Sequence, residues 1–238
     1  MNRKILILGA TSGIGRELAV IYAEKGDTVY ATGRRSELLE ELKAFFPGLI
    51  KTRCFDITSE DCPSYIEEII NDSGGIDLCI ISSGVGYPNP ELDYKLELDT
   101  FSVNITGFTI ASCLMFNHFK KRGGGHLAGI SSIAGLRADD RNPAYGTSKN
   151  FERFYLSALR KKSLKNKLNI TVTAILPGFV DTAMAKSDKI FWLQPVRKAS
   201  EQIYKALENK KRNVYITRRW TLVAWLIKII PDFIFNKI

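Results

Sequence analysis

A tyrosine and a lysine stand four positions apart in the segment NPAYGTSK, and side chains of these types can exchange a proton with a substrate. Pro143 suits the first turn of a helix, and Asn142 before it is a favourable N-cap. On that helix Tyr145 and Lys149 share one face. A free tyrosine has a pKa of about 10, and a nearby ammonium stabilises the phenolate. The pair could act as a general acid or base, or be two unrelated surface residues, since a chain with 9 tyrosines offers this spacing by chance.

A glycine-rich turn near the N-terminus could hold a phosphate. The segment ILILGATSGIGRELAVIYAEKG predicts a strand, a turn and a helix with Leu18, Ile21 and Tyr22 on its apolar face. Glycines in such a turn let the backbone approach a pyrophosphate, whose charge then lies at the helix N-terminus. Glycines can also simply end a strand. Their position after the first strand, opening a helix, favours a nucleotide site.

Two arginines follow the second predicted strand, where a dinucleotide fold selects its cofactor. An acidic residue at this place would bind the 2′-hydroxyl of NAD. Arg34 and Arg35 stand there instead, and a guanidinium group suits a 2′-phosphate. Arg16 could add a third positive charge, whereas solvated loop arginines are the alternative. The pattern predicts NADP(H) in preference to NAD(H).

The strands and helices that position these residues can be predicted from short apolar runs that alternate with helical patterns. The alternation indicates a Rossmann-type, doubly wound parallel sheet of about seven strands with helices on both faces. We expect one α/β domain over residues 1–217 and a C-terminal helix over 218–238. The predicted strands are Lys4–Gly9, Thr28–Gly33, Leu49–Phe55, Asp77–Ser82, His126–Ser131, Asn169–Leu176 and Asn213–Ile216. The helix from Pro143 should bury Phe151, Phe154, Tyr155, Ala158 and Leu159.

Composition narrows the class of protein. The chain has 238 residues, of which 45% are hydrophobic and 25% charged, values typical of a globular domain. Its four cysteines show no C-x-x-C spacing and it has two histidines, which argues against a metal site or disulfides and favours the cytoplasm. The net charge of +9 is scattered, without the basic face interleaved with aromatics that nucleic-acid binding needs.

Five motifs in chain order resemble those of the short-chain dehydrogenase/reductase family. They are GATSGIG, FDIT, VNITG, GISSIAG followed by YGTSK, and PGFVDT, spread over Lys4 to about Ile216. The resemblance implies a nicotinamide cofactor. Together with Arg34 and Arg35, the implied cofactor residues are Gly9, Thr11, Ser12, Gly13, Ile14, Gly15, Asp56, Ile57, Ser83, Gly84, Tyr145, Lys149, Pro177, Gly178, Val180 and Thr182.

The same resemblance implies the catalytic residues Asn104, Ser132, Tyr145 and Lys149. Tyr145 would exchange the proton and Ser132 would polarise the substrate oxygen. Lys149 would also bind the ribose hydroxyls, and Asn104 would hold a relay water. Of the two strand-end serines, Ser131 is expected to cap the turn.

The fourth strand departs from the family pattern. Members usually carry N-N-A-G after this strand, and ISSG, ending at Gly84, stands here. We expect Ser82 and Ser83 to replace part of the lost asparagine bonding.

The C-terminal third of the sequence contains the segments that we expect to contact the substrate and any partner. Residues 183–200 resemble a substrate lid, and Phe191, Trp192 and Leu193 would suit an apolar or bulky substrate or pack on the core. The run WTLVAWLIKIIPDFIF is too short to span a membrane and is flanked by basic residues. Membrane-surface attachment, packing on the lid and an oligomer contact stay open for it. The family resemblance implies a homodimer or homotetramer.

The leading interpretation is an NADP(H)-dependent oxidoreductase that acts on a small-molecule carbonyl or secondary alcohol. The alternative is a cofactor-binding sensor or interaction protein with a silent active site. The presence of Ser132, Tyr145 and Lys149 favours the enzyme.

Overall fold

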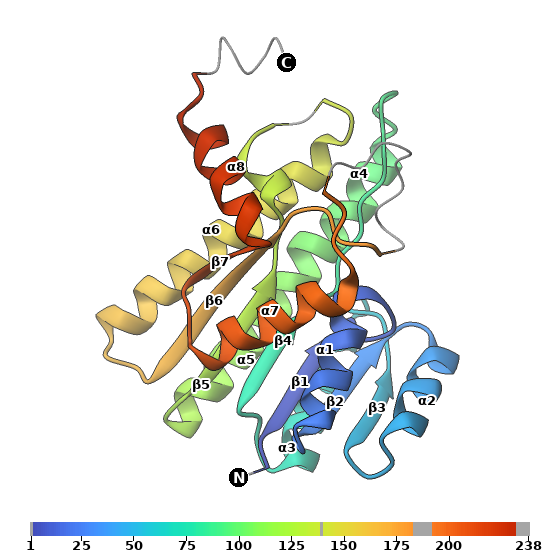
Figure 1. Cartoon of the computed structure of the whole chain (residues 1–238). Coiled ribbons are helices and arrows are strands. Elements are labelled where there is room, and N and C mark those ends of the chain that lie inside the picture. Colours follow the sequence, from blue (N-terminus) through green and yellow to red (C-terminus); the bar gives the residue numbers. More distant parts are fainter. Residues whose placement is uncertain (1, 139, 183–191, 232–238) are drawn as a thin grey trace.

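The strands of the computed structural model form a single parallel sheet. The structure describes residues 2–138, 140–182 and 192–231. Its seven strands follow the order β3-β2-β1-β4-β5-β6-β7 (Figure 1). Strands β2 and β3 are added on one side of β1, and β4 to β7 are added on the other side. The strands are β1 (Lys4–Leu8), β2 (Thr28–Gly33), β3 (Ile50–Cys54), β4 (Leu78–Ile81), β5 (Gly125–Ile130), β6 (Ile170–Pro177) and β7 (Asn213–Ile216). All seven predicted strands are confirmed, each end within one residue.

Helices cover both faces of the sheet, which is why the strands are almost continuously apolar. The helical elements are α1 (Gly13–Glu24), α2 (Ser36–Phe45), α3 (Cys62–Ser73), α4 (Tyr94–Phe101), the π-helix η1 (Ser102–Gly107), α5 (Phe108–Arg122), the 3₁₀-helix η2 (Ile133–Leu136), α6 (Pro143–Lys165), α7 (Val196–Glu208) and α8 (Arg218–Ile229). Helices α1, α2 and α7 contribute to one buried cluster, and α3, α5 and α6 to the other. This arrangement confirms the Rossmann-type fold.

Helix α6 begins where the sequence predicts but is held differently at its start. Pro143 is its first residue, as expected. Asn142 is the N-cap residue, as predicted, but its side chain makes no cap hydrogen bond and its Oδ1 is buried without a partner. The backbone carbonyl of Asn142 instead accepts from the N–H groups of Tyr145 and Gly146, at 3.1 and 3.3 Å.

The predicted buried stripe of α6 is also wrong in part. Phe154 is 70% exposed, and Ala158 is exposed as well. The face toward the sheet carries Lys149, Glu152 and Leu156, all buried. An apolar pattern misses such a face because two of its side chains are charged and satisfy each other.

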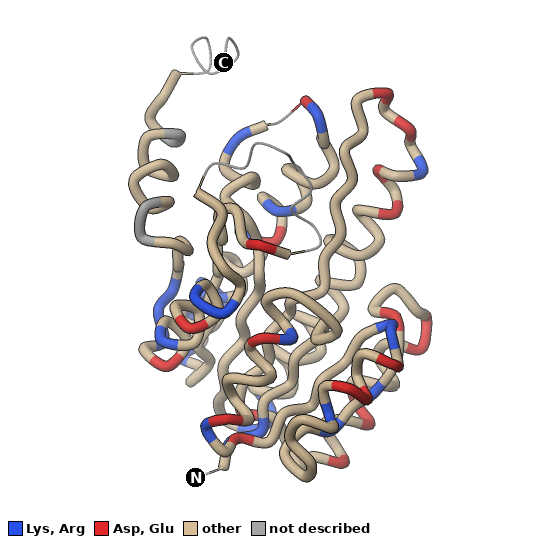
Figure 2. Tube along the Cα trace, turned by 45° about the vertical axis from the view of Figure 1, so that its right-hand side comes forward, with Lys and Arg blue, Asp and Glu red and all other residues tan. Residues whose placement is uncertain are grey.

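Charged residues surround the sheet without gathering into one basic face in the view of Figure 2, where both signs alternate along the helices. In helix α8, by contrast, the stretch from Trp220 to Leu226 contains no charged residue. Within the described ranges, no helix is long and apolar enough to cross a membrane.

Candidate active site

The glycine turn between β1 and α1 is shaped by close backbone contacts. Gly9 has a φ of 89°, and a Cβ there would lie 2.5 Å from the backbone nitrogen of Ser83. A Cβ on Gly15 would collide with the carbonyl oxygen of Gly9. A Cβ on Gly13 would lie 3.2 Å from Cγ2 of Thr182, so the first and last predicted cofactor loops meet here. The turn therefore offers bare backbone and a helix N-terminus, the surface that a pyrophosphate requires.

The two predicted selectivity arginines have different surroundings. Arg35 donates from Nη2 to the hydroxyls of Thr11 and Ser12, at 2.6 and 2.7 Å, and so clamps the glycine turn. Because the Ser12 hydroxyl makes no cap bond to α1, it stays available beside the helix N-terminus. Arg34 is 58% exposed and lies 3.3 Å from Oδ2 of Asp56. Its guanidinium can therefore turn toward an anion without leaving a buried charge behind.

Asp56 and Ile57 follow β3 at the same edge. Partial burial opposes ionisation of Asp56, but hydrogen bonds from Thr58 and the Arg34 charge outweigh it and lower the pKa of that carboxyl. Ile57 is buried, and its carbonyl oxygen would lie 2.9 Å from a Cβ on Gly107. Ile14 is partly buried against the core. Arg16 lies over the ring of Phe45, 5.5 Å from its centroid.

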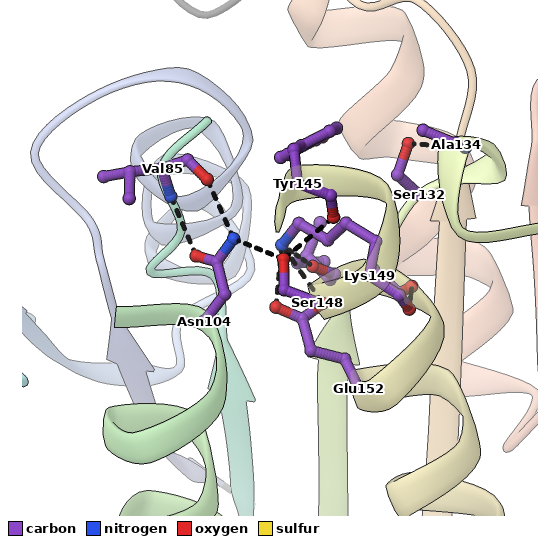
Figure 3. A network of polar contacts seen from close by, with 10 residues as sticks. Val85, Asn104, Ser132, Ala134, Tyr145, Ser148, Lys149 and Glu152 are labelled. Carbon is purple, nitrogen blue, oxygen red and sulfur yellow. Dashed lines mark hydrogen bonds and ion pairs between the residues drawn. The ribbon is translucent and has the colours of Figure 1, made fainter. Parts of the chain in front are cut away.

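Tyr145 and Lys149 lie on one face of α6, near the end of β5 that carries Ser132 (Figure 3). The Lys149 Nζ is 5.8 Å from the centroid of the Tyr145 ring. Ser132 caps η2, accepting from the N–H of Ala134 at 3.1 Å, while Ser131 donates to the Lys149 carbonyl at 2.6 Å. The expectation that Ser131 caps the turn is thus wrong. Ser131 points inward and fixes α6 to β5, which leaves Ser132 on the open side.

Lys149 has a partner that the sequence patterns do not predict. Its Nζ donates to both carboxylate oxygens of Glu152, at 2.8 and 3.1 Å, and to the carbonyl of Ile130 at 3.2 Å. Glu152 is fully buried, and burial raises the pKa of its carboxyl to about 7 although the Lys149 charge opposes this. The spacing of three residues on one helix was the available signal.

Asn104 is buried in the π-helical segment η1, where it braces the loop after β4. Its Oδ1 accepts from the N–H of Val85 at 2.9 Å, and its amide donates to the Val85 carbonyl at 2.8 Å and to Ser148 at 2.9 Å. The predicted replacement bonding by Ser82 and Ser83 is wrong, because neither hydroxyl makes a hydrogen bond within the described residues. Asn104 does this bracing instead.

Glycines also bring the β4 loop close to the catalytic pair. A Cβ on Gly84 would lie 3.0 Å from Nζ of Lys149. A Cβ on Gly86, which the sequence reading did not single out, would collide with the ring of Tyr145. Both glycines are therefore packing requirements of the site.

The loop after β6 borders the site on the side opposite the β4 loop. Its Gly178 N–H donates to the Ile216 carbonyl at 2.6 Å, and a Cβ on Gly178 would collide with the indole of Trp220. Val180 pairs with Gln194 across the base of the predicted lid. Trp192 and Leu193 are about two-fifths exposed, and Phe191 lies outside the described residues. Trp220 stands edge-on to both Phe179 and Trp192, so α8 begins by packing on this loop.

The described residues contain no group of three or more His, Cys, Asp or Glu that could hold a metal ion. What the fold and the site define is a dinucleotide-binding oxidoreductase with a Ser, Tyr and Lys set beside a glycine turn.

Comparisons with known proteins place the chain more narrowly. It matches the short chain dehydrogenase family over residues 3–190. An uncharacterized oxidoreductase of Myxococcus xanthus is 28% identical, covering 98% of this chain and 95% of its own. Dehydrogenase/reductase SDR family member 11 of Mus musculus is 29% identical, covering 77% of this chain and 75% of its own.

Solved structures agree on the fold. A short-chain dehydrogenase from Streptomyces avermitilis superposes with a TM-score of 0.83 at 20% identity, covering 96% of this chain and 92% of its own. The closed form of a serine dehydrogenase complexed with NADP+ gives 0.79 at 22% identity, covering 90% and 94%. This chain belongs to the short-chain dehydrogenase/reductase family and is an NAD(P)-dependent oxidoreductase of that family.

Proposed function

We propose that this protein is an NADP(H)-dependent reductase of carbonyl compounds, or dehydrogenase of secondary alcohols, with apolar or bulky substrates. The observation that carries the proposal is the meeting of Ser132, Tyr145 and Lys149 at the carboxyl end of the sheet, beside the glycine turn. When bound, the nicotinamide cofactor gives or accepts the hydride.

The residues of this chain handle the proton and the oxygen. Tyr145 donates a proton to the carbonyl oxygen, or accepts one from the alcohol in reverse. Ser132 donates a hydrogen bond to the same oxygen, which stabilises the charge that builds up there. Lys149 stabilises the phenolate and binds the ribose. Asn104 keeps the β4 loop in place and holds a relay water.

The cofactor residues divide between backbone and side chains. Gly9, Gly13 and Gly15 give room for the pyrophosphate at the start of α1, with the hydroxyls of Thr11 and Ser12 next to it. The loop from Pro177 to Thr182 lies on the nicotinamide side. Asp56 and Ile57 contact the adenine, and the residues Ser83 and Gly84 lie against the nicotinamide half.

The test of the reaction is a panel of carbonyls and alcohols followed at the nicotinamide absorbance with both cofactors. We expect turnover with NADPH on at least one apolar ketone or secondary alcohol. Binding of NADPH without turnover of any compound would instead favour the silent sensor.

Cofactor preference rests on the exposed guanidinium of Arg34. A 2′-phosphate carries about two negative charges and pairs well with this group. The serine dehydrogenase with a related fold was solved with NADP+, in line with this choice. In Arg34→Asp the preference for NADPH over NADH should fall at least tenfold, about 1.4 kcal/mol. Arg34→Lys should keep most of it. Equal affinities for the two cofactors in the unmutated protein would contradict the proposal.

The same proposal places the protein in the cytoplasm as a homodimer or homotetramer that also contacts a membrane surface. The four free cysteines support a reducing compartment. On α6, Phe154 is 70% exposed and Leu164 is 59% exposed, so this helix offers apolar side chains to a subunit contact. Light scattering at micromolar concentration tests the assembly.

Membrane contact is supported by the exposed side chains of Leu222, Trp225 and Ile229 on α8. Basic residues flank this stretch in the sequence, and each adds about 1 kcal/mol near an anionic surface. Flotation with acidic and neutral vesicles at low and high salt separates this contact from a subunit contact. Failure to bind acidic vesicles at low salt would assign α8 to the oligomer or the lid.

A further inference from the structure

Glu152 is a buried carboxylate that the reaction, as described, does not use. It lies one turn beyond Lys149 on α6, on the side away from the Tyr145 ring (Figure 3). Its side chain is 0% exposed and that of Lys149 is 5% exposed. A carboxylate is rarely buried in this way unless it is paired, because removal from water is costly.

The pair occupies most of the donors of Lys149, so a ribose hydroxyl that binds this lysine has to replace one of its present acceptors. An ammonium group has three donors, and Nζ has three acceptors in Oε1 and Oε2 of Glu152 and the carbonyl of Ile130. Two of the three come from one carboxylate, so the position of Lys149 depends on Glu152 more than on any other group. Gly84 leaves just enough room for the Nζ to lie there.

We propose that Glu152 is a positioning residue that holds the Lys149 ammonium and opposes its charge, and so sets how strongly Lys149 acidifies Tyr145. This inference rests on the proposed roles of Tyr145 and Lys149. Lys149 alone would favour the phenolate with its full charge. A carboxylate at 2.8 Å cancels much of that field at Tyr145, more so because both charges lie in the low-dielectric interior.

The charge of Glu152 changes in the working range of pH. Burial raises the pKa of its carboxyl to about 7, against the attraction of Lys149. No other charged side chain, on α6 or on the strands and helices packed against it in the described structure, acts on that pKa. Below this pH the carboxyl is neutral and Lys149 acts on Tyr145 with its whole charge. Above it the acidifying effect is reduced.

Replacing Glu152 with glutamine should therefore make Tyr145 a stronger acid. The amide keeps the shape and one acceptor for Nζ but carries no charge. A single charge about 6 to 8 Å away, at an effective dielectric of about 20 to 40, changes the pH of ionisation by about one to two units. We expect the phenol of Tyr145 to ionise at a pH lower by this amount in Glu152→Gln.

The measurement follows the phenol directly, without substrate. Protein labelled with ¹³C at tyrosine Cζ is titrated with and without NADPH, and the Tyr145 signal is assigned by its absence from Tyr145→Phe. Glu152→Asp, which keeps the charge, should ionise closer to the unmutated protein. The control Glu67→Gln, an exposed glutamate on α3, should leave the titration unchanged. A difference below about 0.2 pH unit between Glu152→Gln and the unmutated protein would overturn the inference.

A second measurement on the unmutated protein does not depend on the folding of any variant. With ¹³C at glutamate Cδ, one carboxyl should titrate near pH 7, and the Tyr145 signal should show a second inflection at that pH. A titration of the Glu152 carboxyl that leaves the Tyr145 signal unchanged would overturn the inference. Failure of the proposed function looks different, because Tyr145→Phe would then keep its turnover whatever Glu152 does.

Discussion

The two ends of the sheet use charge in opposite ways. At the amino end, Arg3 pairs with Asp27 at 2.6 Å and with Glu208 at 2.7 Å, and Arg122 pairs with Asp77 at 2.8 Å. These pairs join β1, α7 and the turns before β2 and β4. At the carboxyl end, the pair of Arg34 with Asp56 beside the glycine turn is longer at 3.3 Å.

Hydroxyls and glycines show the same contrast. The carboxyl end carries the hydroxyls of Ser12, Ser132 and Tyr145 beside glycines packed against backbone. At the amino end, Gly26 has a similar φ of 82° but no atom within 4 Å of an added Cβ. One end of the fold is thus closed by its own charges, and the other keeps groups that suit a cofactor and a substrate, as is usual for open α/β sheets.

The largest effect expected at the carboxyl end comes from Tyr145→Phe. Loss of the phenolic hydroxyl removes the proposed proton donor, so turnover should fall about a thousandfold, within the range known for general acid catalysis. NADPH affinity should stay within a few fold, because the ring still packs on Gly86. Steady-state rates and a fluorescence titration measure the two quantities. A variant with near-normal turnover would show that the donor is another group.

Much of this site could be predicted from the sequence because its parts are local. The turn from Gly9 to Gly15 and the pair Tyr145 and Lys149 each lie within seven residues, so spacing alone places them. All strands were found because buried parallel strands are apolar throughout.

What could not be predicted depends on contacts between distant segments. The bracing of Val85 by Asn104 joins the loop after β4 to the helical element η1, 19 residues later, and no pattern in either segment predicts it. Trp220 on Gly178 is a similar case. Glu152 was missed for another reason, because a charged residue on a helix normally predicts a solvent-facing side. The capping predicted for Ser131 is made by Ser132, because adjacent residues at a strand end point to opposite faces and the register decides which one turns inward.

A pair of glycine substitutions compares the two ends by the same chemical change. In Gly26→Ala the only cost is backbone strain at positive φ, about 1 kcal/mol. In Gly9→Ala the same strain is joined by the 2.5 Å approach to Ser83, and the sum should be about 3 kcal/mol. Urea denaturation measures both. Gly9→Ala should also lose NADPH affinity, whereas Gly26→Ala should not. Equal costs at the two positions would mean that the Ser83 loop moves freely.

The last effect expected belongs to the amino end and is revealed by pH. His126, at the start of β5, is nearly buried and bonds Oγ1 of Thr173 at 2.9 Å. Thr173 donates its own hydrogen to the Lys211 carbonyl, so the histidine must be the donor. Burial, with smaller contributions from Lys210 and Arg3, lowers the pKa of His126 to about 4. The unfolded chain has the ordinary pKa of about 6.5 and takes up the proton first as pH falls.

The folded state should therefore lose stability as pH falls from about 6.5 through 4, by roughly 3 kcal/mol in all. In His126→Gln the amide can still donate to Thr173 but cannot be charged, so this loss should disappear. His118, the other histidine, is only half-buried, and its pKa is lowered by this partial burial and by the charge of Arg122. His118→Gln is therefore the matched control. Urea denaturation at pH 7.5, 5.5 and 4.5 measures the difference. NADPH affinity at pH 7.5 should be unchanged in both variants, because neither histidine lies at the carboxyl end. If His126→Gln weakens cofactor binding, the two ends are coupled through β5, and the division between a closed end and a working end does not hold.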